Sequence, residues 1–189
     1  MSQPKYSERF DDAMNLTMQA FRCKDRKGSG VPYIMHLLAV CAMVGEHGGD
    51  EDQIIAALLH DYLEDVPEAS AEELSARFGE RVARFVVALS DTMVFPKPPW
   101  KKRKVAYLAG LGSKPVEIKL ISAADKVHNC RSILQDHKLI GDAIFDRFNP
   151  EKAETIWYYE QCVQALSENW QHPLLDELSK AVAELSALR

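Results

Sequence analysis

Apolar residues recur at the three-and-four spacing of an amphipathic helix along almost the whole chain. No stretch shows a convincing alternation of apolar and polar residues, the pattern of a half-buried strand. The predicted helices include residues 7–22, 34–47, 80–92 and 115–134, the last of them long and mostly buried. Ser7 is predicted to cap the first of these helices, and Asp50 is predicted to cap a further helix. The pattern therefore predicts an all-α protein with about eight to ten helices.

Capping signals predict three more helix starts. They lie at Ser70, with Glu73 completing a capping box, at Asn149-Pro150 and at His172-Pro173. The helix from Asn149 is expected to reach about Trp170, and the last helix spans 173–188. Three prolines in residues 96–99 exclude a helix there and predict a surface loop.

Composition narrows the class of protein. With 189 residues, 47% of them apolar and 27% charged, the chain is predicted to form one globular domain over residues 1–189. A formal net charge of −5 argues against general nucleic-acid binding. The longest purely apolar run is 37–44 and the start MSQPKYSERFDD is polar, so neither a membrane span nor a signal peptide is expected. Four scattered cysteines form no CxxC pair and are expected to be reduced thiols in a cytoplasmic protein.

The stretch LLHDYLED, residues 58–65, carries the strongest candidates for chemistry. On one continuous helix, its polar residues would share an arc of roughly 140°. These residues are His60, Asp61, Glu64 and Asp65. One imidazole and three carboxylates so close together repel unless a cation is present or some groups are protonated. A divalent metal ion resolves that conflict directly.

Two other predicted helices add ligand types at apolar positions. His36 lies in PYIMH, and Asp125 and Asn129 lie four residues apart in ISAADKVHN. A carboxylate on such a helix is costly to bury unless it is paired or binds a metal. Two imidazoles and two carboxylates form an N/O set that suits Mn²⁺, and Zn²⁺ or another divalent ion also accepts them. Such a set predicts hydrolysis of a phosphoester or of a pyrophosphate-bearing ester.

The order H, then HD, then a distant D resembles the HD-domain metal phosphohydrolases. The sequence is more similar still to the hydrolase domain of the Rel/Spo alarmone enzymes, and most of all to their stand-alone form, the small alarmone hydrolases. The matching stretches are GVPYIMH, AALLHDYLED, ARFGERV and ADKVHN. The resemblance runs from about residue 7 to about residue 170, which leaves 173–188 as a C-terminal helix.

The resemblance implies a role for each matching residue. The implied metal ligands are His36, His60, Asp61 and Asp125, and the metal in that family is usually Mn²⁺. Glu64 and Asp65 would position or deprotonate the attacking water. The implied substrate contacts are Asn129, Arg26, Lys27, Lys97 and Tyr158, with Asn129 near the ribose and 3′ phosphates and Tyr158 against the base.

The resemblance therefore implies a pyrophosphohydrolase that removes the 3′-diphosphate from (p)ppGpp-like alarmones, a reaction of the stringent response. An adenine alarmone or another nucleotide is an alternative substrate. A non-catalytic HD module that binds a nucleotide is a further alternative, but such a binder has no need of Glu64 and Asp65. The expected partner is a small nucleotide, with no nucleic acid and no membrane, and the oligomeric state is left open.

Overall fold

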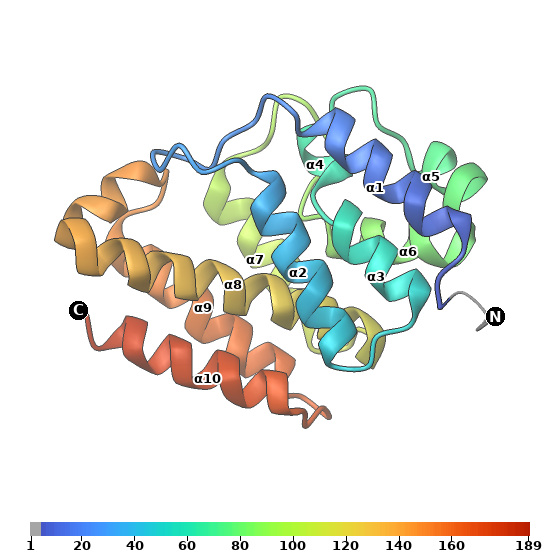
Figure 1. Cartoon of the computed structure of the whole chain (residues 1–189). Coiled ribbons are helices and arrows are strands. Elements are labelled where there is room, and N and C mark those ends of the chain that lie inside the picture. Colours follow the sequence, from blue (N-terminus) through green and yellow to red (C-terminus); the bar gives the residue numbers. More distant parts are fainter. Residues whose placement is uncertain (1–4) are drawn as a thin grey trace. The chain divides into compact units, whose positions relative to one another are not determined.

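The computed structural model describes residues 5–189 and divides the chain into two compact units, residues 1–95 and 96–189. The described residues form ten α-helices and one 3₁₀ helix and contain no strand, which confirms the all-α prediction (Figure 1). Residues 1–4, where the polar start that argues against a signal peptide begins, lie outside the described residues. The expectation of a single domain stays a prediction.

The first unit is built around a short buried helix, α3 (Glu51–Leu59), which packs against α1, α2 and α6. Every residue of α3 from Gln53 to Leu59 is buried, because apolar side chains face all sides of this helix. The other helices of the unit are α1 (Glu8–Ala20), α2 (Ile34–Glu46), α4 (Tyr62–Asp65), α5 (Ala71–Phe78) and α6 (Glu80–Leu89). The candidate ligands of this unit lie at the ends of its most buried helices, α2 and α3.

Local hydrogen bonds explain where the helices of the first unit begin. The Asp50 side chain accepts from the Gln53 backbone N–H, and the Gln53 side chain accepts from the Asp50 N–H, so α3 has a complete capping box. Ser70 caps α5 by accepting from the Glu73 N–H. The Glu73 carboxylate instead pairs with Arg77 on α5, so only half of the predicted capping box forms.

The second unit is organised along its longest helix, α8 (Val116–Ile140). Its 25 residues give a length of about 38 Å, and it packs against α9, α10 and the 3₁₀ helix η1. The remaining elements are α7 (Trp100–Leu111), η1 (Gly141–Arg147), α9 (Lys152–Leu166) and α10 (Pro173–Ser186). Helix α8 extends beyond the predicted limit of residue 134.

The predicted start and end of α9 are wrong. The helix begins at Lys152 with Glu151 as its N-cap, and it ends at Leu166 instead of near Trp170. The reason lies in η1, which occupies residues 141–147 and leaves Asn149-Pro150 in the connection to α9.

Helix α7 is an element that the sequence pattern did not predict. It opens on four basic residues in a row after Trp100, and cations are unfavourable near a helix N-terminus. Helix α9 offsets part of this cost. The Lys101 ammonium pairs with Glu154 and lies 3.3 Å from the ring centroid of Trp157, both on α9.

The four cysteines differ sharply in exposure, which predicts their reactivity. Cys23 is exposed, whereas Cys41, Cys130 and Cys162 are buried, and all four are free. Burial raises the pKa of the Cys41 and Cys162 thiols to about 11. Because the thiolate is the reacting species, we expect one fast-reacting thiol per native chain with Ellman's reagent near neutral pH.

Absorbance of the released thiolate measures this count. Cys23→Ser should remove the fast phase, and all four thiols should react after unfolding. Two or more fast thiols in the native protein would contradict the burial of the other three.

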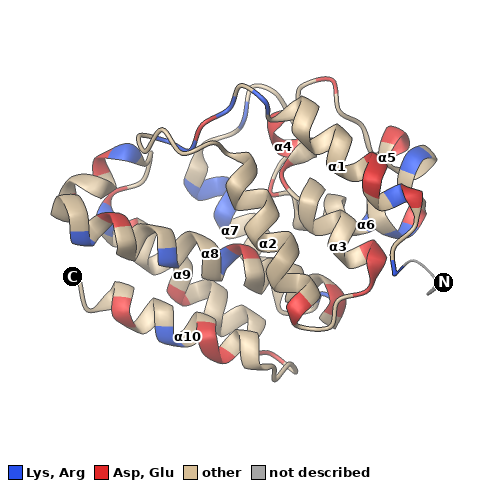
Figure 2. Cartoon of the chain, viewed as in Figure 1, with Lys and Arg blue, Asp and Glu red and all other residues tan. Residues whose placement is uncertain are grey.

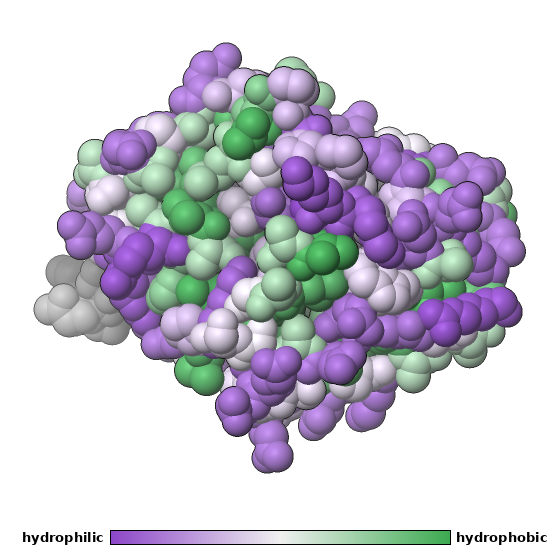
Figure 3. All heavy atoms as spheres, turned by 180° about the vertical axis from the view of Figure 1, so that it is seen from behind, coloured by the Kyte–Doolittle hydropathy of each residue, from purple (hydrophilic) through white to green (hydrophobic). Residues whose placement is uncertain are grey.

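None of the described helices has the length and apolar character that crossing a membrane demands. On the face drawn in Figure 3, apolar side chains occur in small groups separated by hydrophilic ones.

Candidate functional site

The HD dipeptide lies at a break between two helices. Helix α3 ends at Leu59, His60 is its C-cap, and Asp61 precedes α4 with φ −98° and ψ 2°. The predicted arc of His60, Asp61, Glu64 and Asp65 on one continuous helix is therefore wrong. The Asp61 backbone has the sparsely populated conformation near φ −90° and ψ 0°, and the next helix, α4, begins directly after it.

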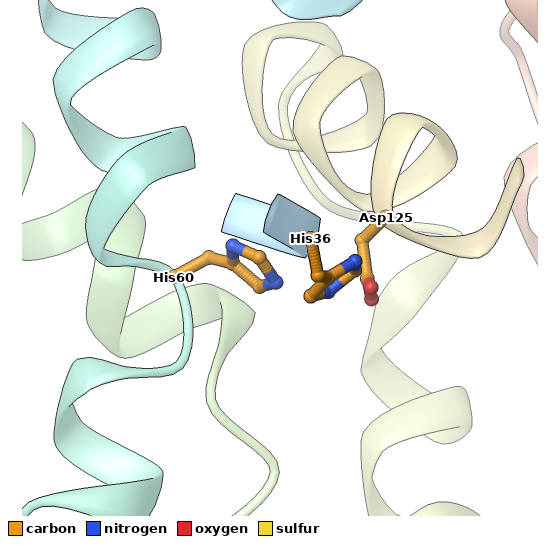
Figure 4. Close-up of side chains that lie close together, drawn as sticks. All are labelled: His36, His60 and Asp125. Atoms are coloured by element: carbon orange, nitrogen blue, oxygen red, sulfur yellow. The ribbon is translucent and has the colours of Figure 1, made fainter. Parts of the chain in front are cut away.

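Within the first unit, the break brings three candidate ligand groups together. His36 belongs to the first turn of α2, and its ring centroid lies 5.2 Å from that of His60 at an interplanar angle of 74° (Figure 4). The Asp61 Oδ2 atom lies 3.3 Å from His60 Nε2 and 3.9 Å from His36 Nε2. Both imidazoles are buried, with relative exposures of 2% for His36 and 4% for His60. Two imidazole nitrogens and one carboxylate oxygen thus converge.

The surrounding contacts fix the orientation of these groups. His60 Nδ1 lies 2.7 Å from the Ala57 carbonyl oxygen. Because a carbonyl only accepts, Nδ1 carries the hydrogen, and in the neutral ring Nε2 is then the nitrogen with the lone pair. The Tyr33 hydroxyl donates to Asp61 Oδ2. Metal-binding histidines commonly donate their second N–H to a carbonyl, so this arrangement fits a divalent cation.

Helix polarity adds to this fit. His60 stands at the C-terminus of α3, where the aligned carbonyl dipoles carry partial negative charge. A cation beside His60 is stabilised by that end of the helix.

In the second unit, Asp125 is a buried carboxylate on α8 whose two oxygens are both engaged. The Lys126 ammonium pairs with Oδ2, and the Asn129 side-chain amide donates to Oδ1. Burial lowers the pKa of Lys126, but the charge of Asp125 together with those of Tyr158, Tyr107 and Cys162 outweighs burial and raises that pKa well above its usual value. Like His36 and His60, Asp125 is buried and offers a ligand atom for a metal ion, and Figure 4 labels all three.

Glu64 and Asp65 follow Asp61 by three and four residues on α4. Each carboxylate is held by a different segment of the first unit. Glu64 Oε1 accepts from the Asp91 backbone N–H at 2.7 Å, and Asp65 Oδ2 accepts from the Lys24 ammonium. A pair of oriented carboxylates that follows Asp61 on the same short helix is suited to accept a proton.

Comparison with known proteins decides the family. A model of the HD domain matches residues 13–150. The chain belongs to the HD domain family. The chain is 32% identical over 125 residues to the guanosine-3′,5′-bis(diphosphate) 3′-pyrophosphohydrolase MESH1 of Danio rerio, a match that covers 65% of this chain and 67% of that protein.

Longer proteins also contain this HD domain. A probable guanosine-3′,5′-bis(diphosphate) 3′-pyrophosphohydrolase of Synechocystis is 29% identical over 136 residues, covering 70% of this chain and 16% of that protein. The chain therefore spans about a sixth of the length of that relative. A solved structure described as a metazoan ortholog of SpoT that hydrolyzes ppGpp has a TM-score of 0.77 at 22% identity, covering 97% of this chain and 98% of that one. This last likeness shows that the HD domain has the same fold.

The predicted substrate contacts fall in both units of the HD domain. Arg26 and Lys27 lie in the loop between α1 and α2, and Lys97 is exposed just before α7. Figure 2 shows basic residues in this part of the ribbon and on α7. Asn129 holds Asp125, as described above. Tyr158 is buried, 5% exposed, with its ring centroid 5.8 Å from that of Trp100.

Burial raises the pKa of Tyr158 well above its usual value, so its hydroxyl stays protonated. Its contacts are those of a packing residue between α7 and α9, and the base contact implied by the resemblance stays a prediction.

The sequence did not identify Tyr33 and Lys24 as residues that contact the candidate carboxylates. Tyr33 lies inside the matching stretch GVPYIMH, which was interpreted through its histidine alone. Lys24 begins the basic run KDRK, of which only Arg26 and Lys27 were singled out. Both residues contact carboxylates that are distant in sequence, Asp61 and Asp65, and no local pattern shows such contacts.

Proposed function

We propose that this HD domain is a metal-dependent pyrophosphohydrolase that removes the 3′-diphosphate from (p)ppGpp-like alarmones, releasing pyrophosphate and a GDP- or GTP-like nucleotide. The observation that carries the proposal is the convergence of Asp61 Oδ2 on two buried imidazole nitrogens, followed one turn later by Glu64 and Asp65. The substrate class is supported by the MESH1 relative, whose name describes this reaction.

The metal ligands in this proposal are His36, His60, Asp61 and Asp125. Mixed imidazole and carboxylate ligands support Mn²⁺ as the preferred ion, with Zn²⁺ as the alternative. A divalent cation bound there lowers the pKa of water and offsets the negative charge of a phosphoryl group.

Glu64 and Asp65 are proposed to orient the attacking water and accept its proton. Both are partly buried, and both are anchored, Glu64 by the Asp91 N–H and Asp65 by Lys24. An anchored carboxylate keeps its orientation towards the reacting atoms, which lowers the entropic cost of the reaction.

The phosphates of the substrate are proposed to contact Arg26, Lys27 and Lys97, three basic side chains on loops. Asn129 is proposed to place the ribose near the 3′ phosphates. We also propose that the enzyme works in the cytoplasm, because its four cysteines are all free thiols.

Analysis of the products tests the function. With Mn²⁺, ppGpp should give GDP and pyrophosphate, because the oriented carboxylates act on water next to the 3′-diphosphate. Chelation should stop turnover, Mn²⁺ should restore it better than Mg²⁺, which binds imidazole poorly, and GTP should be barely hydrolysed. Anion-exchange chromatography separates these products.

Each competing function has its own signature in this assay. Inorganic phosphate as the product, or equal turnover of GTP, would identify a general nucleotidase. Faster turnover of an adenine alarmone would shift the base preference. Nucleotide binding without turnover under any divalent metal would indicate a non-catalytic module.

A further inference from the structure

The loop between α1 and α2 is closed at its base by backbone hydrogen bonds. The Tyr33 N–H donates to the Lys24 carbonyl at 2.8 Å, and the Arg26 N–H donates to the Val31 carbonyl at 2.8 Å. Between them, Asp25 and Pro32 form an isolated antiparallel bridge. Lys24 and Tyr33 are therefore neighbours at the base, while residues 27–30 form the tip.

Three contacts determine the position of the Lys24 ammonium. It pairs with Asp65 Oδ2, and it lies 4.4 Å from the ring centroid of Tyr33 and 5.4 Å from that of Phe21. These two rings are stacked, with centroids 5.5 Å apart and an interplanar angle of 17°. An ammonium over an aromatic ring is attracted by the partial negative charge on the ring face. The two rings therefore hold the ammonium in a position where it pairs with Asp65.

The base of the loop thus holds two carboxylates of the proposed active site. Tyr33 donates to Asp61, and Lys24 pairs with Asp65 on the same short helix. Helix α4 has only four residues, so its own hydrogen bonds do little to fix the Asp65 side chain. We propose that Lys24 is a positioning residue, which orients the Asp65 carboxylate for proton transfer. This inference rests on the proposed hydrolase function.

An ordinary structural ion pair would look similar, so a matched control is needed. The side chains of Lys24 and Asp65 are 36% and 17% exposed. Arg81 and Asp52, also in the first unit, form a pair with 36% and 21% exposure. Arg81 contacts the start of α3, at the opposite end of that helix from His60. Arg81→Met therefore removes the ion pairs of Arg81 with Asp52 and Asp50 without touching the proposed active site.

The experiment compares Lys24→Met, Lys24→Arg and Arg81→Met in ppGpp hydrolysis with saturating Mn²⁺. For Lys24→Met we expect kcat to fall about tenfold or more, because misplacement of a reacting group is costly. KM and Mn²⁺ affinity, measured by titration calorimetry, should stay unchanged, because the backbone bonds still close the loop. Lys24→Arg should restore most of kcat, and Arg81→Met should lower the melting temperature while leaving kcat intact.

A double-mutant cycle separates positioning from a general loss of stability. If Lys24 acts through Asp65, then Lys24→Met should cause no further loss in an Asp65→Asn background. Full activity of Lys24→Met, or losses that simply multiply in the double variant, would overturn the inference while the hydrolase function stands. A wild-type protein that leaves ppGpp intact would overturn the function itself, and the inference with it.

Discussion

Replacement of His60 by alanine is expected to abolish both metal binding and hydrolysis. The imidazole offers Nε2 beside Asp61, and its Nδ1 is fixed by the Ala57 carbonyl. Loss of a group that only hydrogen-bonds to a metal ligand typically costs about 10–100-fold in metal affinity or activity. Removal of the ligand itself should therefore cost more than about 100-fold. Metal content after dialysis, measured by elemental analysis, and the rate of ppGpp hydrolysis check this result.

His137→Ala is the matched control, because this histidine pairs with Asp142 in the second unit. That variant should keep its metal and its rate. An His60→Ala protein that is folded by circular dichroism yet still binds Mn²⁺ with wild-type affinity would show that His60 is not a ligand.

Glu64→Gln and Asp65→Asn are expected to keep the metal and lose most of the rate. The amides nearly preserve the shape of the side chains but cannot accept a proton at neutral pH. Proton transfer by a positioned group typically contributes about 10²–10⁴-fold, and we expect losses in kcat of that order. Single-turnover kinetics with Mn²⁺-loaded protein measures the chemical step directly.

Glu160→Gln serves as the control, since Glu160 bonds to Ser186 and Arg189 at the surface of the second unit. Its kcat should match that of the wild type. If Glu64→Gln or Asp65→Asn did the same, the residue concerned would have no part in proton transfer.

The helix ends that could be predicted from the sequence are those with a local physical cause. Ser7, Asp50 and His172 are N-caps as expected, because their side chains accept hydrogen bonds from backbone N–H groups two or three residues on. Helix α7 was missed because it is held by packing against α9, which lies about 50 residues away in sequence, and this packing includes the contacts of Lys101 with Glu154 and Trp157.

The break between α3 and α4 at His60 and Asp61 could not be predicted from the local sequence either. The identity of the ligand types was predictable, since a buried histidine or aspartate in an apolar helix calls for a partner. The break itself was not, because YLED continues a helical pattern after LLHD. The contacts of Tyr33 and Lys24 with the two carboxylates depend on the closing of the loop, which only the folded chain shows.

The loop between α1 and α2 has a closed base, which contacts the candidate carboxylates, and an exposed tip, which does not take part in those contacts. At the base, Lys24 and Tyr33 contact the Asp65 and Asp61 carboxylates. The exposed tip carries Lys27 and two glycines with left-handed backbone, Gly28 and Gly30. Exposed tips of this kind tolerate insertions and exchanges. Substitutions in the tip are therefore expected to alter the proposed phosphate contact of Lys27 while leaving the contacts of Lys24 and Tyr33 with Asp65 and Asp61 in place.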